Sequence, residues 1–196
     1  TLGSLILFLA SRYAFGPVWR NEKPGPGRFR EFTQCDADTV GSARPEADAE
    51  MIAMAVEGLA AAGLPAGAYV LKINNRKLLN AVMTAAGVTD AGQALGVLRA
   101  IDKLDRLGPD GVRLLLGEGR LDESGAFTKG AGLNAKAAES VLAFVQGEAG
   151  TRSGTLAKLA DVVGGSAEGV EGLEELARID TALKGLGVSD DQARFD

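Results

Sequence analysis

Residues 24 to 27 read Pro-Gly-Pro-Gly, a run that no helix tolerates. Extended segments flank this run on both sides between Arg12 and Val40. Two extended segments joined by a turn rich in proline and glycine are typical of a β-hairpin. The sequence therefore predicts a long hairpin loop whose tip lies at the Pro-Gly run.

The periodicity of the apolar residues changes after the hairpin, from two residues to between three and four. Pro45 stands where the first turn of a helix accepts proline, and the acidic residues that follow it complement the positive end of a helix. Apolar residues then recur at helical spacing until Gly63 ends the pattern. After this helix we expect a strand over residues 68–73, a turn over 74–77 and a second helix over 77–87.

Helical spacing of apolar residues continues through the second half of the chain. It predicts that residues 89–165 are helical throughout and that a last helix covers residues 172–187. A glycine-rich stretch over residues 117–133 resembles a phosphate-binding loop only superficially, because it lacks Gly-Lys-Ser/Thr and no predicted strand precedes it. We interpret this stretch as an ordinary loop.

The chain contains no histidine, and this absence limits its chemistry. Ser-His-Asp triads, Cys-His dyads and His-ligated metal sites all need an imidazole. Any chemistry must therefore rely on arginine, lysine, carboxylates, amides and the backbone, and we expect no metal held by the protein itself. The single Cys35 excludes a disulfide within the chain and fits a reducing cytoplasm.

Charge and length exclude two further classes of protein. A net charge of −5 and a pI near 4.9 argue against nucleic-acid binding through bulk charge, so any phosphate contact must come from a local patch. The apolar segment over residues 1–10 is too short for a bilayer, which takes about 20 residues, and it lacks the basic residues of a signal peptide. We expect a core strand or an edge of the chain there, in a cytoplasmic protein without membrane contact.

Polar and apolar side chains alternate along the second strand of the predicted hairpin, and side chains two residues apart share a face. The odd-numbered residues are small or apolar, and we expect them to pack: Phe29, Thr33, Cys35 and Ala37. The even-numbered residues carry nearly all the polar groups: Arg30, Phe32, Gln34, Asp36 and Asp38. On this face Phe32 could stack on a planar ring, while Gln34 and the carboxylates could bind the polar edges of a ligand.

Four basic residues surround the predicted turn: Arg20, Lys23, Arg28 and Arg30. They repel one another unless an anion lies between them, and the fork of an arginine suits phosphate oxygens. A polyphosphate is the obvious candidate, and Glu22 shares the face of Arg20. Solvated loop charges on a half-exposed antiparallel sheet explain the charge and the alternation equally well.

The order of residues in "FGPVWRNEKPGPGRFREFTQCDAD", residues 15–38, favours the binding site. It resembles the second signature motif of class II aminoacyl-tRNA synthetases, an Arg-x-Glu strand, a flexible loop and then Gly-Arg-x-Arg-x-Phe. More narrowly it is similar to the histidyl-tRNA synthetase family, in which the loop leads into Arg-Glu-Phe-x-Gln-x-Asp-x-Asp. The resemblance continues in "LKINNRKLLNAV", "VLRAIDKLDRLG" and "LEELARIDTALKGLGVSDDQARFD", and so runs from about Arg12 to Asp196.

The resemblance implies that four residues bind ATP. Arg20 would contact the α-phosphate of ATP and the carboxylate of histidine, which makes it the catalytic residue. Glu22 would hydrogen-bond the adenine amino group, Arg28 would reach the outer phosphates, and Phe32 would stack on adenine. Mg²⁺ would be carried by the ATP phosphates.

The resemblance also implies which residues bind the amino acid. Gln34 and Asp38 would bind histidine together with Arg20, and Asp38 would offer a carboxylate to its ammonium or imidazole. For Lys23, Arg30 and Asp36 we keep the interpretation of structural or solvated charge.

The fold implied by the resemblance is α+β. We expect a partial class II antiparallel sheet with flanking helices over residues 1–88 and 166–196, and an inserted all-helical domain over 89–165 that helps to hold the tRNA acceptor stem. The family's first and third motifs, its histidine-specific segment and its anticodon-binding domain do not appear in the chain. We therefore expect an internal piece of the catalytic domain of a homodimeric enzyme, inactive alone.

The expected function is that of part of a histidine-tRNA ligase, which activates histidine with ATP and transfers it to tRNA. One alternative is a non-catalytic synthetase paralogue that serves as the regulatory subunit of ATP phosphoribosyltransferase. Such a paralogue has less reason to retain Arg20, Glu22, Arg28 and Phe32 together. A second alternative is a stand-alone binding module unrelated to ATP. Titration with ATP separates these, because only a synthetase-like site responds to loss of Arg20.

Overall fold

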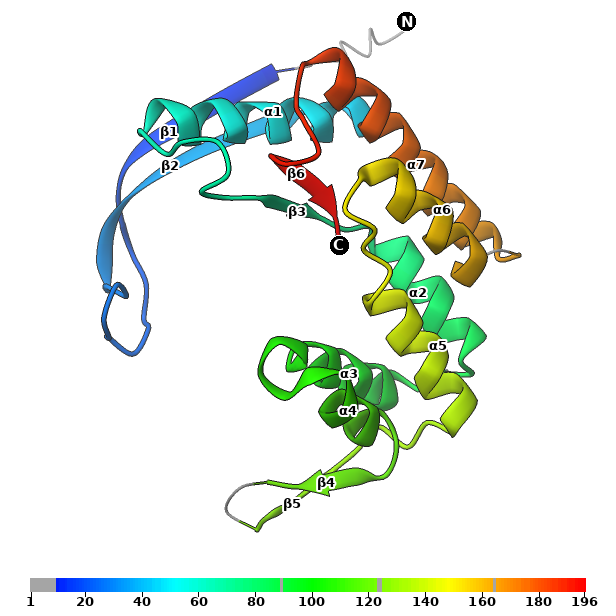
Figure 1. The fold of residues 1–196 in the computed structure, drawn as a ribbon. Coiled ribbons are helices and arrows are strands. Elements are labelled where there is room, and N and C mark those ends of the chain that lie inside the picture. The colour runs from blue at the N-terminus through cyan, green and yellow to red at the C-terminus, as the bar shows by residue number, and fades with distance from the viewer. Residues whose placement is uncertain (1–9, 89, 123–124, 164) are drawn as a thin grey trace, which may run out of the picture.

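The computed structural model of the chain describes residues 10–88, 90–122, 125–163 and 165–196. The elements follow one another in this order: β1 (Ala10–Trp19), β2 (Glu31–Val40), α1 (Pro45–Ala61), β3 (Leu71–Ile73), α2 (Arg76–Ala85), α3 (Ala91–Ile101), α4 (Leu104–Leu116), β4 (Gly119–Leu121), β5 (Phe127–Lys129), α5 (Ala135–Val145), α6 (Arg152–Val163), α7 (Ala167–Gly185) and β6 (Ala193–Phe195). The expected α+β class is confirmed (Figure 1). The expectation for the apolar N-terminal segment falls on residues 1–9, outside the described part.

β1 and β2 form the predicted hairpin. They pair antiparallel from Ala10 opposite Val40 to Trp19 opposite Glu31. Gly27 at the tip has a φ of 71°, in the region that favours glycine. Figure 1 shows the hairpin as a long curved ribbon beside α1, with its tip far from the other helices.

β3 and β6 pair in a way that differs from the antiparallel sheet expected from the sequence. They run parallel, with Leu71 opposite Ala193 and Ile73 opposite Phe195. Parallel strands need a long crossover connection, and the helices between β3 and β6 supply one. In the described residues the strands form three separate two-stranded sheets, β1–β2, β3–β6 and β4–β5.

The segment over residues 89–165 is not helical throughout, so the expectation of an all-helical domain is wrong. The glycine-rich stretch over residues 117–133, expected to be an ordinary loop, contains two strands. β4 and β5 form a short antiparallel hairpin, with Arg120 opposite Thr128. Gly119 permits this close pairing, because a Cβ at that position would lie 2.2 Å from the backbone oxygen of Thr128. Strands of three residues are too short to show a periodicity in the sequence.

The core lies among the helices. α7 packs against α1, α2 and α6, and Arg178 of α7 binds Glu46 of α1 through both carboxylate oxygens at 2.7 to 3.0 Å. The largest fully buried apolar side chains include Leu78, Leu116, Leu142, Leu176, Leu183 and Phe195. In the described residues no helix is long and apolar enough to cross a membrane.

One arginine joins α6 to the C-terminal end of the described chain. Arg152 is 1% exposed, and its Nε donates to Asp180 of α7 at 2.7 Å. Its other guanidinium nitrogens donate to the backbone oxygens of Val188, Ser189 and Ala193 at 2.8 to 3.0 Å. These bonds fix the turn that leads into β6, so α6 and α7 hold β6 beside β3.

Candidate functional site

The register of the hairpin gathers the even-numbered residues of both strands on one face, because directly paired residues of antiparallel strands share a face. Small residues of β1 stand opposite polar residues of β2: Ala14 faces Asp36, and Gly16 faces Gln34. A Cβ at Gly16 would meet no atom within 4 Å, so the space above the strand is open. Here the small residues of β1 leave the even-numbered face open, and the polar groups beside this open area come from β2.

Three of the predicted site residues are in contact on this face. The Nη2 of Arg20 donates to Oε1 of Gln34 at 3.0 Å. The guanidinium carbon of Arg20 lies 5.2 Å from the centre of the Phe32 ring, within the range of a cation–π interaction. Phe32 and Gln34 are half-buried, whereas the next four residues of β2 are exposed. A planar ring, a cation and an amide therefore meet at one point of the hairpin.

Asp36 sets the orientation of the Gln34 amide. The Nε2 of Gln34 donates to Oδ1 of Asp36 at 2.6 Å, while its Oε1 accepts from Arg20. A glutamine amide has two donors and an oxygen with two lone pairs. One N–H and one lone pair thus remain for a ligand. Asp36, for which the sequence predicted a structural or solvated charge, has a structural contact: it holds the amide of Gln34, the residue predicted to bind the amino acid.

Asp38 lies toward the other end of the face and pairs with an arginine. The Nε of Arg12 donates to Oδ2 of Asp38 at 2.8 Å, and the two residues are directly opposite in the register. Both side chains are exposed, so the pair is weak. Arg12 was not among the site residues predicted from the sequence, although it has the parity of Arg20 on the same strand.

Glu22 and Arg28 pair with each other near the hairpin tip. The Nε of Arg28 lies 2.6 Å from Oε2 of Glu22, and Arg28 is largely exposed. The Nε of Arg30 donates to the backbone oxygen of Glu22 at 3.0 Å, and the N–H of Arg20 donates to the backbone oxygen of Arg30 at 2.9 Å. Because Arg30 holds the base of the loop through the backbone, it has a structural contact.

The odd-numbered face does not pack, contrary to the expectation from the alternation of the sequence. Thr33, Cys35 and Ala37 are exposed, and so are the aromatic rings opposite or beside them on β1. The contact of this face with α1 is near the end of β2, where Thr39 Oγ1 lies 4.0 Å from Met51 Sδ. The expectation is wrong in the described chain because α1 reaches only that end of the hairpin.

No group of three or more histidine, cysteine, aspartate or glutamate side chains with the geometry of a metal site occurs in the part of the chain that the structure describes. The candidate site thus consists of a cation–ring–amide contact, flanked by one ion pair at the tip and another along the strand. Such a set can bind an anion beside a planar ring and a polar group beside the amide.

Comparison with known proteins identifies the family. A family model described as histidyl-tRNA synthetase matches residues 11–196. The chain belongs to the histidyl-tRNA synthetase family. The histidine-tRNA ligase of Caulobacter vibrioides is 76% identical over 186 residues, and that of Paracoccus denitrificans is 55% identical over 185 residues.

The chain corresponds to part of the length of its relatives. The matches cover 94% of the chain but only 38% and 37% of the two curated ligases. The crystal structure of histidyl-tRNA synthetase from Nostoc sp. PCC 7120 superposes with a TM-score of 0.76 at 28% identity, over 98% of this chain and 41% of that one. The mixed fold described above is therefore similar to that of a solved histidyl-tRNA synthetase.

Proposed function

We propose that the protein to which this chain belongs is a cytoplasmic histidine-tRNA ligase. It activates histidine with ATP to histidyl-adenylate and transfers the histidine to tRNA, and we expect it to act as a homodimer. The contact of Arg20 with Phe32 and Gln34 carries the proposal, because adenylate formation needs a cation, a ring platform and an amino-acid ligand together. The relatives named as histidine-tRNA ligases support it.

In this proposal Arg20 acts on the reacting groups. The histidine carboxylate oxygen attacks the α-phosphorus of ATP, an oxygen–phosphorus bond forms, and the bond to the leaving pyrophosphate breaks. Negative charge moves toward the pyrophosphate, and a cation already in place stabilises it without reorganising. Arg28 pairs with Glu22 in this structure, and we expect the outer phosphates of ATP to replace Glu22 as the partner of Arg28. Mg²⁺ would be bound to those phosphates.

The remaining residues orient the two substrates. Phe32 would stack on adenine and Glu22 would accept from the adenine amino group. Gln34 would bind the amino acid through its free N–H, and Asp38 would accept from its ammonium or imidazole. Because Asp38 now pairs with Arg12 at an exposed position, exchange of that partner for a substrate cation costs little.

The alternative, a regulatory subunit of ATP phosphoribosyltransferase, has less support. It requires no cation beside the ring, and both relatives compared above are named as ligases. A non-catalytic paralogue would bind histidine or ATP without exchanging pyrophosphate.

The experiment is ATP–pyrophosphate exchange with histidine, measured on the intact protein and on its Arg20→Ala variant. We expect exchange in the intact protein and a loss on the order of 10²-fold or more in the variant, the scale of removing one group that stabilises transition-state charge. Arg99→Ala is the matched control, since Arg99 is an exposed arginine of α3 outside the hairpin. Absence of histidine-dependent exchange in the intact protein would falsify the proposal.

A further inference from the structure

One ion pair on the even-numbered face joins a proposed ligand residue to an arginine that has no role in the proposed function. The Nε of Arg12 on β1 donates to Oδ2 of Asp38 on β2 at 2.8 Å, and the two residues are directly opposite in the register. Asp38 is the carboxylate that the proposed function assigns to the cationic group of histidine. Arg12 therefore binds the same carboxylate to which the substrate cation would bind.

The geometry of this pair favours exchange of Arg12 for another cation. Arg178, which joins α7 to α1, binds both carboxylate oxygens of Glu46 through two nitrogens. Arg12 instead donates one N–H to one oxygen of Asp38, and its other guanidinium nitrogens have no hydrogen-bond partner in the described part of the chain. The side chains of Arg12 and Asp38 are 74% and 49% exposed, so water can replace the contact when the pair opens.

The strand beside Arg12 leaves room for a displaced side chain. Ala14 and Gly16 follow on the same face of β1, and a Cβ at Gly16 would meet no atom within 4 Å. Asp36 is opposite Ala14 and is thus the diagonal neighbour of Arg12, at a separation that long side chains span. One oxygen of Asp36 accepts from the glutamine amide described above, and the other has no hydrogen-bond partner among the described residues. Arg12 can therefore move from Asp38 toward Asp36 and keep a carboxylate partner.

We propose that Arg12 is an internal counter-ion of Asp38 which the cationic group of the amino acid must displace, and that Arg12 thereby sets the affinity and selectivity of the site for its amino-acid substrate. The proposal rests on the proposed function, because it takes Asp38 as the ligand of that group. Arg12 acts on the substrate through Asp38, so it is a positioning residue.

Competition by Arg12 favours ligands that make a second contact. A ligand gains from Asp38 only the difference between its own attraction and that of Arg12. A simple amine therefore gains little. An amino acid gains more, because its carboxylate also contacts Arg20 in the proposed function.

The test uses the intact protein and histidinol, which has the ammonium and imidazole groups of histidine but no carboxylate. Histidinol therefore reports on Asp38 separately from Arg20. Arg12→Gln removes the counter-ion, whereas Arg12→Lys keeps a positive charge opposite Asp38. Isothermal titration at several salt concentrations gives the affinity of each protein for histidinol.

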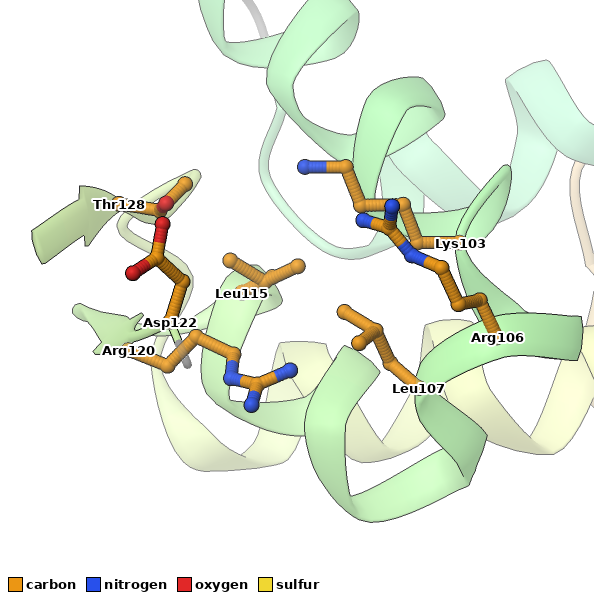
Figure 2. Close-up of a pocket in the computed structure, with 7 residues that line it drawn as sticks. All are labelled: Lys103, Arg106, Leu107, Leu115, Arg120, Asp122 and Thr128. Carbon is orange, nitrogen blue, oxygen red and sulfur yellow. The ribbon is translucent and has the colours of Figure 1, made fainter. Parts of the chain in front are cut away.

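The matched control for the loss of one positive charge comes from another part of the chain. Arg106 belongs to α4, and Figure 2 shows its side chain beside that of Lys103, at a cavity whose opposite side carries Arg120. None of these three cations belongs to the β1–β2 hairpin. Arg106→Gln therefore changes the net charge as Arg12→Gln does, without removing the partner of Asp38.

We expect Arg12→Gln to bind histidinol about two- to fivefold more tightly than the unsubstituted protein, the range that an exposed ion pair allows. Its affinity should also fall more steeply with salt, because histidinol then forms a new ion pair instead of replacing an existing one. In pyrophosphate exchange the KM for histidine should fall while the KM for ATP stays the same. Arg12→Lys and Arg106→Gln should behave as the unsubstituted protein does in all three measurements.

Equal, weaker or undetectable binding of histidinol to Arg12→Gln overturns the proposal. Equal binding would mean that the ion pair only stabilises the hairpin, and weaker binding would mean that Arg12 holds Asp38 in place for the substrate.

Failure of the proposed function has a different signature. If the intact protein shows no histidine-dependent pyrophosphate exchange, the ligase assignment fails, whereas tighter binding of histidinol to Arg12→Gln still supports Arg12 as the counter-ion. If exchange occurs and both proteins bind histidinol equally, the ligase assignment stands and the proposal for Arg12 fails.

Discussion

At the residue scale, the order of hydrogen bonds along β2 decides what the candidate site can offer. Asp36 accepts from Gln34, and Gln34 accepts from Arg20, so the amide cannot flip without losing both bonds. This fixes a donor on the side of Asp36 and an acceptor on the side of Arg20. The alternation of the sequence put Gln34 and Asp36 on one face of the second strand, but it carried no information on the register that adds Arg20 or on the direction of the amide.

Replacing Phe32 by alanine should weaken ATP binding to the intact protein by about 1 kcal/mol or more, the scale of an aromatic contact. The substitution removes both the ring proposed to stack on adenine and the ring over which Arg20 lies. Isothermal titration with ATP measures the change. Phe29→Ala is the control, since Phe29 is an exposed aromatic residue of the same hairpin. Equal affinities for the two variants would contradict the role of Phe32.

Replacing Asp38 by alanine should raise the KM for histidine much more than the KM for ATP. A substrate ammonium or imidazole would lose its charged partner, and Arg12 would be left without its own. Steady-state pyrophosphate exchange gives both constants. Asp161→Ala, at an exposed position of α6, should change neither. Parallel increases in both constants for Asp38→Ala would point to a folding defect instead.

At the element scale, the residues within a segment were sufficient to predict some helices and strands but not others. Pro45 begins α1 as predicted, and that helix ends at Ala61, two residues before the predicted stop at Gly63, whose φ is 89°. Caps and periodicity lie within the segment they shape, so the sequence reveals them. The β4–β5 hairpin is too short to show a period.

The packing of Arg152 could not be predicted either. It is a polar residue at the start of a helix, and its burial depends on partners 28 to 41 residues away. The same limit applies to the hairpin, since alternation defines two faces but does not say which element covers either one. The contact of Arg20 with Gln34 depends on the register of the two strands, which alternation within each strand does not give.

Replacing Asp180 by asparagine tests the junction of α6, α7 and β6. Burial opposes ionisation of Asp180 and is the largest single influence, but hydrogen bonds from Lys184 and Arg152 outweigh it and lower its pKa below the usual value. A pKa that is lower in the folded than in the unfolded state stabilises the fold at pH values above the unfolded pKa of about 3.9. This stabilisation is lost as the pH falls through the folded pKa. At pH 7 the substitution should therefore lower the free energy of unfolding by about 3 kcal/mol, the scale of breaking a buried ion pair.

Urea unfolding at pH 7 and near pH 3 measures this difference. We expect the gap between Asp180→Asn and the unsubstituted chain to narrow at the lower pH, because below the unfolded pKa of about 3.9 the aspartate of the unfolded chain takes up a proton that the folded chain resists. Asp161→Asn should show almost no gap at either pH, since Asp161 is exposed. A gap of constant size would mean that packing rather than charge accounts for the loss.

At the scale of the whole molecule, the core and the candidate site lie in different parts. No residue of β2, nor any from Ser11 to Trp19 of β1, is buried, whereas the helices supply most of the buried apolar residues. Tyr13, Phe15 and Trp19 are 83%, 75% and 68% exposed. The site thus stands on a two-stranded sheet with one polar and one apolar face, both open to water in this chain, which spans 38% of the length of its Caulobacter relative.

The 196-residue chain by itself should bind ATP at most weakly and form no detectable histidyl-adenylate. Arg20 and Arg28 are exposed, so water and salt screen their attraction for phosphates. The open apolar face should instead cause the chain to self-associate. Sedimentation of the purified chain measures association, and pyrophosphate exchange measures activity. Phe15→Ser should reduce association, whereas Leu121→Ser, at an exposed apolar position outside the β1–β2 hairpin, should not. Exchange near the rate of an ordinary synthetase would show that a two-stranded site, open on both faces, is sufficient for the chemistry.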